Sequence, residues 1–110
     1  MFAEKGYNIL AIDISEDMIK KAILKNVYEK CRFEVMDMRN IQVNKKVDLV
    51  YCLFDGMTYI GDVNEIKKII QNISTYLEEE GYFVFDYFSY NDYKYIYGEL
   101  ECEQKYVDIN

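Results

Sequence analysis

The sequence predicts an α/β fold with a mostly parallel sheet and flanking helices. Short apolar runs alternate along the chain with stretches whose apolar residues recur at helical spacing. That order is typical of parallel strands joined by crossover helices. The runs are almost continuously apolar, as expected of strands buried on both faces. With 110 residues and no linker-like composition, residues 1–110 are expected to form a single domain.

The first half of the chain is expected to hold two strands and a helix. Residues 1–5 are interpreted as the last turn of a helix, which Gly6 ends. Residues 8–12 form the first apolar strand. Ser15 is placed to cap the N-terminus of the next helix, whose first turn carries two acidic residues. Residues 32–36 form the second strand, and a polar loop follows.

The second half is expected to hold two more strands and two helices. Residues 47–54 form the third strand, followed by the loop "DGMTYIG". Asp62 is placed to cap a helix whose isoleucines recur at helical spacing until Gly81. Residues 82–88 form the fourth strand. A short tyrosine-rich helix at about 90–97 and a strand start at the very end of the chain complete the prediction.

Composition excludes several classes of function. Twenty acidic against thirteen basic residues give a net charge of −7, which disfavours nucleic-acid binding. The apolar runs are too short to span a membrane, and no signal-peptide pattern is present, so we expect a cytoplasmic protein. There is no histidine, and the three cysteines have no CxxC spacing. We therefore expect no metal site and reduced thiols.

Acidic residues follow two successive strands, at the sheet edge where α/β proteins bind ligands. Asp13 closes the first strand. Its carboxylate could accept hydrogen bonds from both hydroxyls of a ribose, or it could be an ordinary turn acid before the helix; Asp13 alone leaves these two readings open. Asp37 follows the second strand, 24 positions later. It could accept a hydrogen bond from the exocyclic amine of adenine, or it could simply begin a loop.

The third and fourth strands end in less specific residues. Leu53 and Phe54 lie where a cofactor would contact the sheet edge, although buried core is the commoner role for such residues singly. Asp55 and Tyr59 are candidates for a substrate-facing loop. The fourth strand ends in an acid, Asp86, among aromatic residues that are as readily packing residues as pocket walls.

Together these stretches resemble the class I S-adenosylmethionine-dependent methyltransferases of a small bacterial type. The resemblance rests on "DISEDM" (13–18), "DMRN" (37–40), "VDLVYCLFDGMTY" (47–59) and "YLEEEGYFVFDYFSYNDY" (76–93), and covers about residues 3 to 98. It implies a partial Rossmann-like fold with S-adenosylmethionine as cofactor. By this resemblance Asp13 would hold the ribose and Ile14 would pack on adenine. Met36, Asp37 and Met38 would line the adenine, with Asp37 on its amine, and Leu53 would flank the methionine portion. No catalytic residue is implied, because the protein mainly positions the acceptor for direct methyl transfer.

The chain departs from the family pattern at its beginning. The family's first strand and its glycine-rich cofactor loop have no counterpart in these residues, so the resemblance implies an incomplete domain, a methyltransferase fragment. That strand normally lies at the centre of the sheet. We therefore expect the first and third strands either to pair directly, or to be completed by a second copy or a partner chain. A truncated product with neither arrangement is the third alternative.

The functional prediction is a fragment that transfers a methyl group to a small molecule, with weak or absent cofactor binding by the isolated chain. Two alternatives remain open at this level. One is a fragment of an NAD-type dinucleotide-binding domain, in which Asp13 would also contact a ribose. The other is a non-catalytic acidic interaction module.

Overall fold

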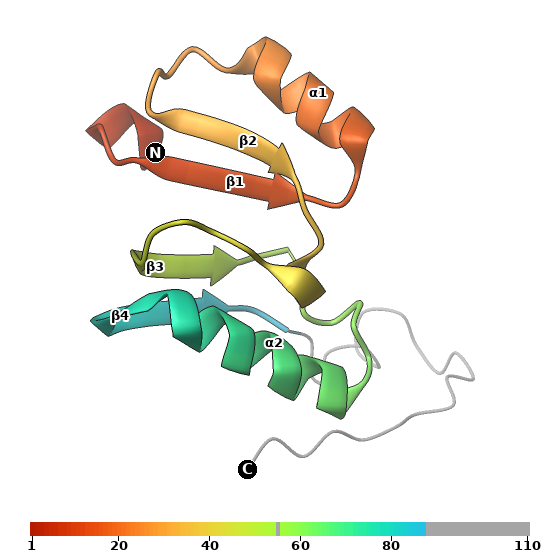
Figure 1. Ribbon diagram of the computed structural model, residues 1–110. Coiled ribbons are helices and arrows are strands. Elements are labelled where there is room, and N and C mark those ends of the chain that lie inside the picture. Colours follow the sequence, from red (N-terminus) through yellow and green to blue (C-terminus); the bar gives the residue numbers. More distant parts are fainter. Residues whose placement is uncertain (55, 88–110) are drawn as a thin grey trace. The chain divides into compact units, whose positions relative to one another are not determined.

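The computed structural model describes residues 1–54 and 56–87, drawn in colour in Figure 1. The chain divides into two compact units, Met1–Gln42 and Val43–Asn110, and each is treated by itself below. Asp55, the helix expected at 90–97 and the strand start expected at the end of the chain lie outside the described residues. Among the described residues, no helix combines the length and the apolar character needed to cross a bilayer.

The first unit is a two-stranded parallel sheet with one crossover helix (Figure 1). Strand β1 (Ile9–Asp13) pairs with β2 (Cys31–Val35), and α1 (Glu16–Lys25) connects them. A short 3-10 helix, η1 (Ala3–Lys5), precedes β1 and ends at Gly6, whose φ of 78° is left-handed. The Ser15 hydroxyl accepts a hydrogen bond from the Met18 N–H at 3.3 Å. The predicted glycine stop and serine cap are therefore confirmed.

The second unit is also a two-stranded parallel sheet joined by one helix, but its helix is capped by an aspartate instead of a serine. Strand β3 (Val47–Cys52) pairs in parallel with β4 (Leu77–Phe85), and α2 (Val63–Tyr76) lies between them in the chain. Asp62 caps α2 as predicted, because its Oδ1 accepts from the Asn64 and Glu65 N–H groups at 2.7 and 3.1 Å. Ile69 and Ile73 of α2 are almost fully buried. This unit's core is therefore built on the predicted isoleucine stripe.

The boundary between α2 and β4 was predicted wrongly. The helix ends at Tyr76, and β4 begins at Leu77 rather than at residue 82. Between the pairs Val47↔Leu77 and Leu49↔Tyr82, β3 advances by two residues while β4 advances by five, so the extra residues form an irregularity in β4. Gly81 lies inside it.

Close approach of backbone explains why a glycine stands at position 81. A Cβ there would lie 3.0 Å from the carbonyl oxygen of Glu78 and 3.2 Å from that of Asp48. Backbone atoms cannot move aside as a flexible side chain can. Gly81 therefore allows β4 to pass close to β3, and it does not end a helix.

The described strands form two separate two-stranded sheets, β1–β2 and β3–β4. Each sheet lies within one unit, so direct pairing of the first and third strands stays a prediction. The parallel pairing itself is confirmed for both sheets. Among the described residues, β1 and β3 each have one hydrogen-bonded neighbour, so completion of the sheet by another chain stays a prediction.

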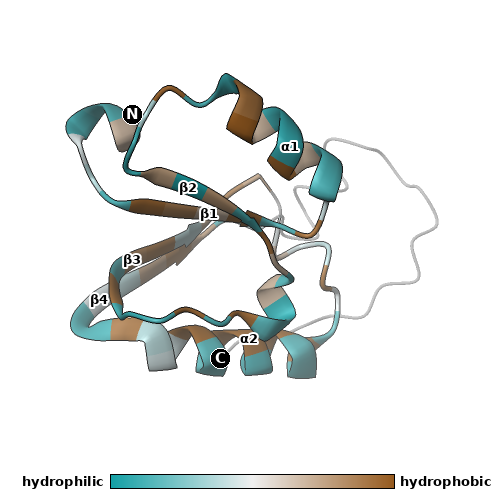
Figure 2. Cartoon of the chain, turned by 45° about the horizontal axis from the view of Figure 1, so that its top comes forward, coloured by the Kyte–Doolittle hydropathy of each residue, from teal (hydrophilic) through white to brown (hydrophobic). Residues whose placement is uncertain are grey.

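The prediction of strands buried on both faces was also wrong for these short sheets. β1 is half-buried along its apolar run, and Val35, Tyr51 and Val84 are each about half exposed. Figure 2 shows how much apolar sequence the strands carry. A two-stranded sheet with a single helix has too little neighbouring structure to cover both of its faces. The apolar pattern therefore identified the strands correctly but overstated their burial.

Candidate functional site

Asp13 is the last residue of β1, and the structure shows the turn role that its sequence position suggested. One carboxylate oxygen, Oδ1, accepts a hydrogen bond from the Ser15 backbone N–H at 2.8 Å, which makes the turn into α1. The Asp13 carbonyl accepts from the Met36 N–H at 3.0 Å and extends the ladder to β2. Among the described residues no hydrogen bond to Oδ2 is present. An exposed carboxylate oxygen is therefore free for a ligand hydroxyl at the end of β1.

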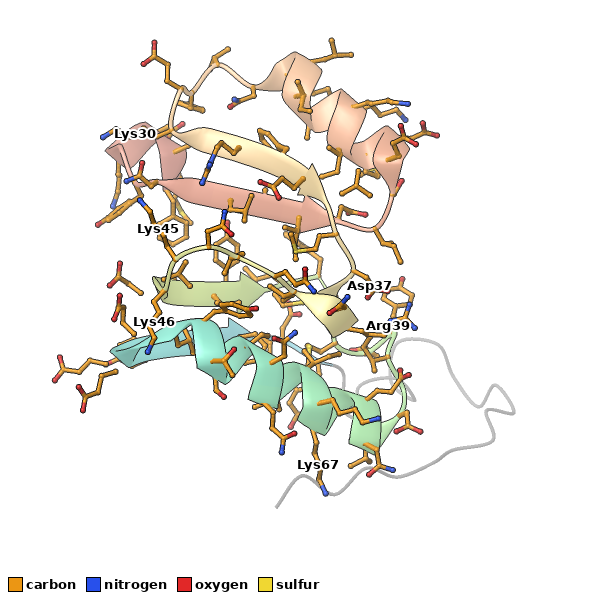
Figure 3. The ribbon with its side chains drawn as sticks, viewed as in Figure 1. Lys30, Asp37, Arg39, Lys45, Lys46 and Lys67 are labelled. Carbon is orange, nitrogen blue, oxygen red and sulfur yellow. The ribbon has the colours of Figure 1, made fainter. Side chains whose placement is uncertain are left out.

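Asp37 lies just beyond β2 and begins a second 3-10 helix, η2 (Met38–Asn40). This short helix was not predicted. Asp37 Oδ1 accepts from the Arg39 backbone N–H at 2.9 Å. The Arg39 guanidinium adds Nε at 3.0 Å from both carboxylate oxygens and Nη2 at 2.6 Å from Oδ2. Figure 3 labels both residues at this turn. Asp37 is thus held by the residue two positions ahead.

The Arg39 contact changes what Asp37 can do. The side-chain hydrogen bond from Arg39, followed by the one from its backbone, holds the pKa of Asp37 below its usual range. A carboxylate has about four lone-pair directions, and Arg39 makes four contacts with this one. An adenine amine would therefore have to take the place of an Arg39 donor. Arg39 was not predicted to have a role, although an arginine two residues after an acid is a visible signal in the sequence.

The parallel register brings the other predicted adenine residues to the same end of the first sheet. Asp13 is paired with Val35, so the residue that follows β1 and the residues that follow β2 leave adjacent strand ends. Ile14 is 65% exposed, which leaves an apolar side chain open to a ligand. Five of the six predicted cofactor residues belong to this strand end: Asp13, Ile14, Met36, Asp37 and Met38.

Leu53, the sixth predicted residue, belongs to the second unit and lies just past the end of β3. It is 44% exposed. The next residue, Phe54, has a φ of 60° and a side chain that is 90% exposed. The Phe54 N–H donates to Oδ2 of Asp86 at 2.9 Å, and the Asp86 N–H donates to the Cys52 carbonyl at 3.2 Å. Asp86 was noted in the sequence, but its bond to the turn after β3 was not foreseen.

Cys52 is the last residue of β3, directly before this turn, and its surroundings do not activate the thiol as a nucleophile. Its thiol is half-buried, and burial is the main cause that raises its pKa. The negative charge of Asp86 raises it further, while a hydrogen bond from the Met57 backbone N–H opposes both effects. The thiol is therefore protonated at neutral pH. Asp55 and Tyr59 were the residues predicted for a substrate-facing loop; of these, Tyr59 is among the described residues, and it is 87% exposed.

No cluster of three or more histidine, cysteine, aspartate or glutamate residues suited to a metal ion occurs in the part of the chain that the structure describes. The carboxylates that end the strands are instead engaged by backbone N–H groups and by Arg39. The arrangement at the first sheet is suited to hydrogen bonding with ligand hydroxyls.

Comparison with known proteins identifies the family. The profile of the methyltransferase domain family matches residues 1–81. The curated Bacillus subtilis protein named "Putative methyltransferase YqeM" is 30% identical over 86 residues, which are 76% of this chain and 35% of that protein.

Solved structures give the same result. An S-adenosylmethionine-dependent methyltransferase from Clostridium acetobutylicum has a TM-score of 0.67 and 34% identity, covering 80% of this chain and 36% of that one. The N-methyltransferase NodS from Bradyrhizobium japonicum has a TM-score of 0.66 at 17% identity, covering 81% of this chain and 49% of that one, and shows the fold alone. The chain spans about a third of the length of the B. subtilis and C. acetobutylicum relatives. It belongs to the methyltransferase domain family, among the class I S-adenosylmethionine-dependent methyltransferases.

Proposed function

We propose that this chain supplies the adenosine-binding part of an S-adenosylmethionine-dependent methyltransferase that acts on a small molecule. The observation that carries the proposal is the end of the first sheet. There Asp13 keeps one exposed carboxylate oxygen free of partners among the described residues, and the paired strand β2 leads directly into Asp37. Membership of the methyltransferase family supports S-adenosylmethionine as the ligand, whose ribose hydroxyls and adenine amine could donate to these two carboxylates.

The residues at this strand end fit the adenosine half of the cofactor. Asp13 would accept hydrogen bonds from ribose hydroxyls through its free oxygen. Ile14 would pack against the adenine ring with its exposed side chain, and Met36 and Met38 would line the same ring. Asp37 would accept from the adenine amine once an Arg39 donor gives way. In the second unit, Leu53 would flank the methionine portion.

The chain contributes positioning rather than acid–base chemistry. Bound S-adenosylmethionine supplies the methyl group on its sulfonium sulfur. The residues named above bind and orient the cofactor, and we assign no catalytic residue. Backbone of the glycine-rich type that holds the methionine end of the cofactor is not present in these 110 residues. We therefore expect weak or absent binding by the isolated chain, consistent with a single, incomplete methyltransferase domain at 1–110.

Three further expectations belong to this proposal. A small-molecule acceptor is favoured over nucleic acid by the net charge of −7. Completion by a second copy or by a partner chain would give β1 and β3 a second neighbour. A cytoplasmic location is the third expectation.

Substitution at Asp13 tests the proposal. S-adenosylhomocysteine and adenosine are titrated into the chain and followed by ligand-observed nuclear magnetic resonance, which detects millimolar binding. Asp13→Ala should weaken binding of both ligands about tenfold, because a charge-assisted hydrogen bond to the ribose is lost. Asp17→Asn is the matched control, since it removes an exposed acid from the first turn of α1. Equal binding by wild type and Asp13→Ala would contradict the proposed role.

A further inference from the structure

The turn after β3 is held in place from β4. The Asp86 carboxylate accepts the Phe54 N–H at 2.9 Å, and the Asp86 N–H donates to the carbonyl of Cys52 at 3.2 Å. One residue at the end of β4 therefore makes hydrogen bonds on both sides of Leu53. These bonds join Asp86 to residues that lie 32 and 34 positions earlier in the sequence.

Phe54 adopts a backbone conformation that phenylalanine rarely takes. Its φ of 60° lies in the left-handed region, and it is the one non-glycine residue with a positive φ in the part of the chain that the structure describes. Glycine or asparagine would occupy this position at lower cost. A left-handed conformation at a bulky residue persists only when its surroundings determine it, and such residues concentrate at ligand sites. Two hydrogen bonds of Asp86 are made at this turn, one to the Phe54 N–H and one to the Cys52 carbonyl.

Core packing does not account for the phenylalanine. The Phe54 side chain is 90% exposed, so its ring gains little from burial in this chain. Leu53, directly before it, is the residue that the family resemblance assigns to the methionine portion of the cofactor, and it too is open to solvent at 44%. An aromatic ring is thus displayed beside a predicted cofactor contact, on strained backbone, at the carboxyl end of a parallel strand.

We propose that Asp86 is a positioning residue, which fixes the left-handed turn after β3 so that Leu53 and Phe54 are presented together as contacts for the bound cofactor. This inference rests on the proposed methyltransferase function. Asp86 acts through the backbone and is not itself a cofactor contact. A turn that is already set needs no ordering when the ligand binds, which lowers the entropic cost of binding.

The conformational part is tested on the free chain. In wild type, a strong intraresidue contact between the amide and α protons of Phe54 should report the positive φ by nuclear magnetic resonance. Asp86→Ala should abolish that signature and speed amide exchange at Phe54 about tenfold. Asp86→Asn keeps an acceptor oxygen and should restore both readouts to near wild type. A double variant, Asp86→Ala with Phe54→Gly, should regain a positive φ, since glycine needs no clamp.

The ligand part is tested with S-adenosylhomocysteine. Saturation transfer from the Phe54 ring to the ligand is expected in wild type, with affinity falling about threefold to tenfold in Asp86→Ala and recovering in Asp86→Asn. Phe54→Gly should keep the turn but lose the ring contact and part of the affinity. If Asp86→Ala does not fold, its amide spectrum will show this. The affinities of Asp86→Asn and Phe54→Gly for S-adenosylhomocysteine are then compared instead.

The outcomes separate this inference from the proposed function. A positive φ at Phe54 that survives Asp86→Ala overturns the positioning role of Asp86. Ligand binding with no transfer from the Phe54 ring overturns the contact and leaves the methyltransferase proposal standing. Complete absence of binding to wild type at millimolar ligand overturns the Phe54 contact in this chain; it agrees with the weak or absent binding expected above, and φ at Phe54 still decides what Asp86 does.

Discussion

The two units end their strands with acids that are held in different ways. In the first unit, Asp13 and Asp37 each bond to a residue two positions ahead, Ser15 and Arg39. In the second unit, Asp86 bonds to Phe54, 32 positions earlier. The local bonds need only a turn. The long-range bond needs β3 and β4 already paired in register. The comparison predicts that damage to a sheet removes the second kind of bond and spares the first.

The largest effect is expected from filling the close approach at Gly81. Gly81→Val places atoms where the carbonyls of Glu78 and Asp48 lie, and it should destabilise the second unit by about 1–3 kcal/mol. The Phe54 amide should lose its protection, while the Asp13–Ser15 bond should persist. Chemical denaturation and amide exchange measure both. The control is Glu79→Ala, an exposed neighbour in β4; an equally large loss there would argue against the close-approach explanation.

A smaller effect is expected at the N-terminus of α2. Asp62→Ala removes the acceptor for the Asn64 and Glu65 N–H groups and should cost about 1 kcal/mol of stability. Asp62→Asn keeps an acceptor and should recover most of the loss. Thermal unfolding of the three proteins tests this local bond. A loss of equal size in both variants would point to charge rather than capping.

The ion pair between Asp37 and Arg39 should contribute less to stability than the Asp62 cap does, but its effect on the pKa of Asp37 should be easy to measure. Arg39→Gln should raise the pKa of Asp37 toward its ordinary value, because the Arg39 hydrogen bonds that lower it are lost. Because the folded pKa is lowered, the stabilisation is present above the unfolded pKa and is lost as the pH falls through the folded pKa. Arg39→Gln should therefore flatten the acid limb of the stability curve.

Carboxyl carbon shifts of Asp37, recorded against pH, measure this effect. The pair is partly exposed to solvent, so its contribution at neutral pH should stay below about 1 kcal/mol. Lys20→Gln breaks a comparable exposed pair with Glu16 and serves as the control. An Asp37 titration that is identical in wild type and Arg39→Gln would show that the ion pair does not form in solution.

The smallest expected effect is on Cys52. Asp86→Asn removes a negative charge beside the thiol and should lower its pKa modestly, because burial remains the main cause of the shift. The pH dependence of iodoacetamide alkylation measures this in a background with Cys31 and Cys102 replaced by serine. Asp48→Asn makes the same charge change on β3. A shift of equal size in that control would mean that general electrostatics, rather than Asp86, sets the value.

Local chemistry made much of the fold predictable. Ser15 and Asp62 were identified as caps because a short polar side chain before a helical stripe can bond only to the N–H groups just ahead of it. Gly6 was identified as a stop for a similar local reason. The apolar runs located all four described strands, and the family resemblance was confirmed by the comparisons. The assignment of cofactor contacts to Asp13, Asp37 and their neighbours stays a prediction.

Contacts between distant residues made the rest unpredictable. The start of β4 depends on how far its backbone must bulge to pair with β3, and the meaning of Gly81 depends on the carbonyl of Asp48 opposite it. The left-handed turn at Phe54 is hydrogen-bonded to Asp86, 32 positions later in the chain. The residue pattern of one segment does not indicate which distant residue it will contact.

The sequence by itself determined which segments are strands and helices, where the helices begin, and to which family the chain belongs, since these follow from residues close together in the chain. The tertiary structure alone decided how two strand ends of similar composition differ. At the first sheet a free oxygen of Asp13 remains because its partner Ser15 is local and uses only one side of the carboxylate. At the second sheet Asp86 is committed to Phe54, because parallel pairing brings the ends of β3 and β4 together.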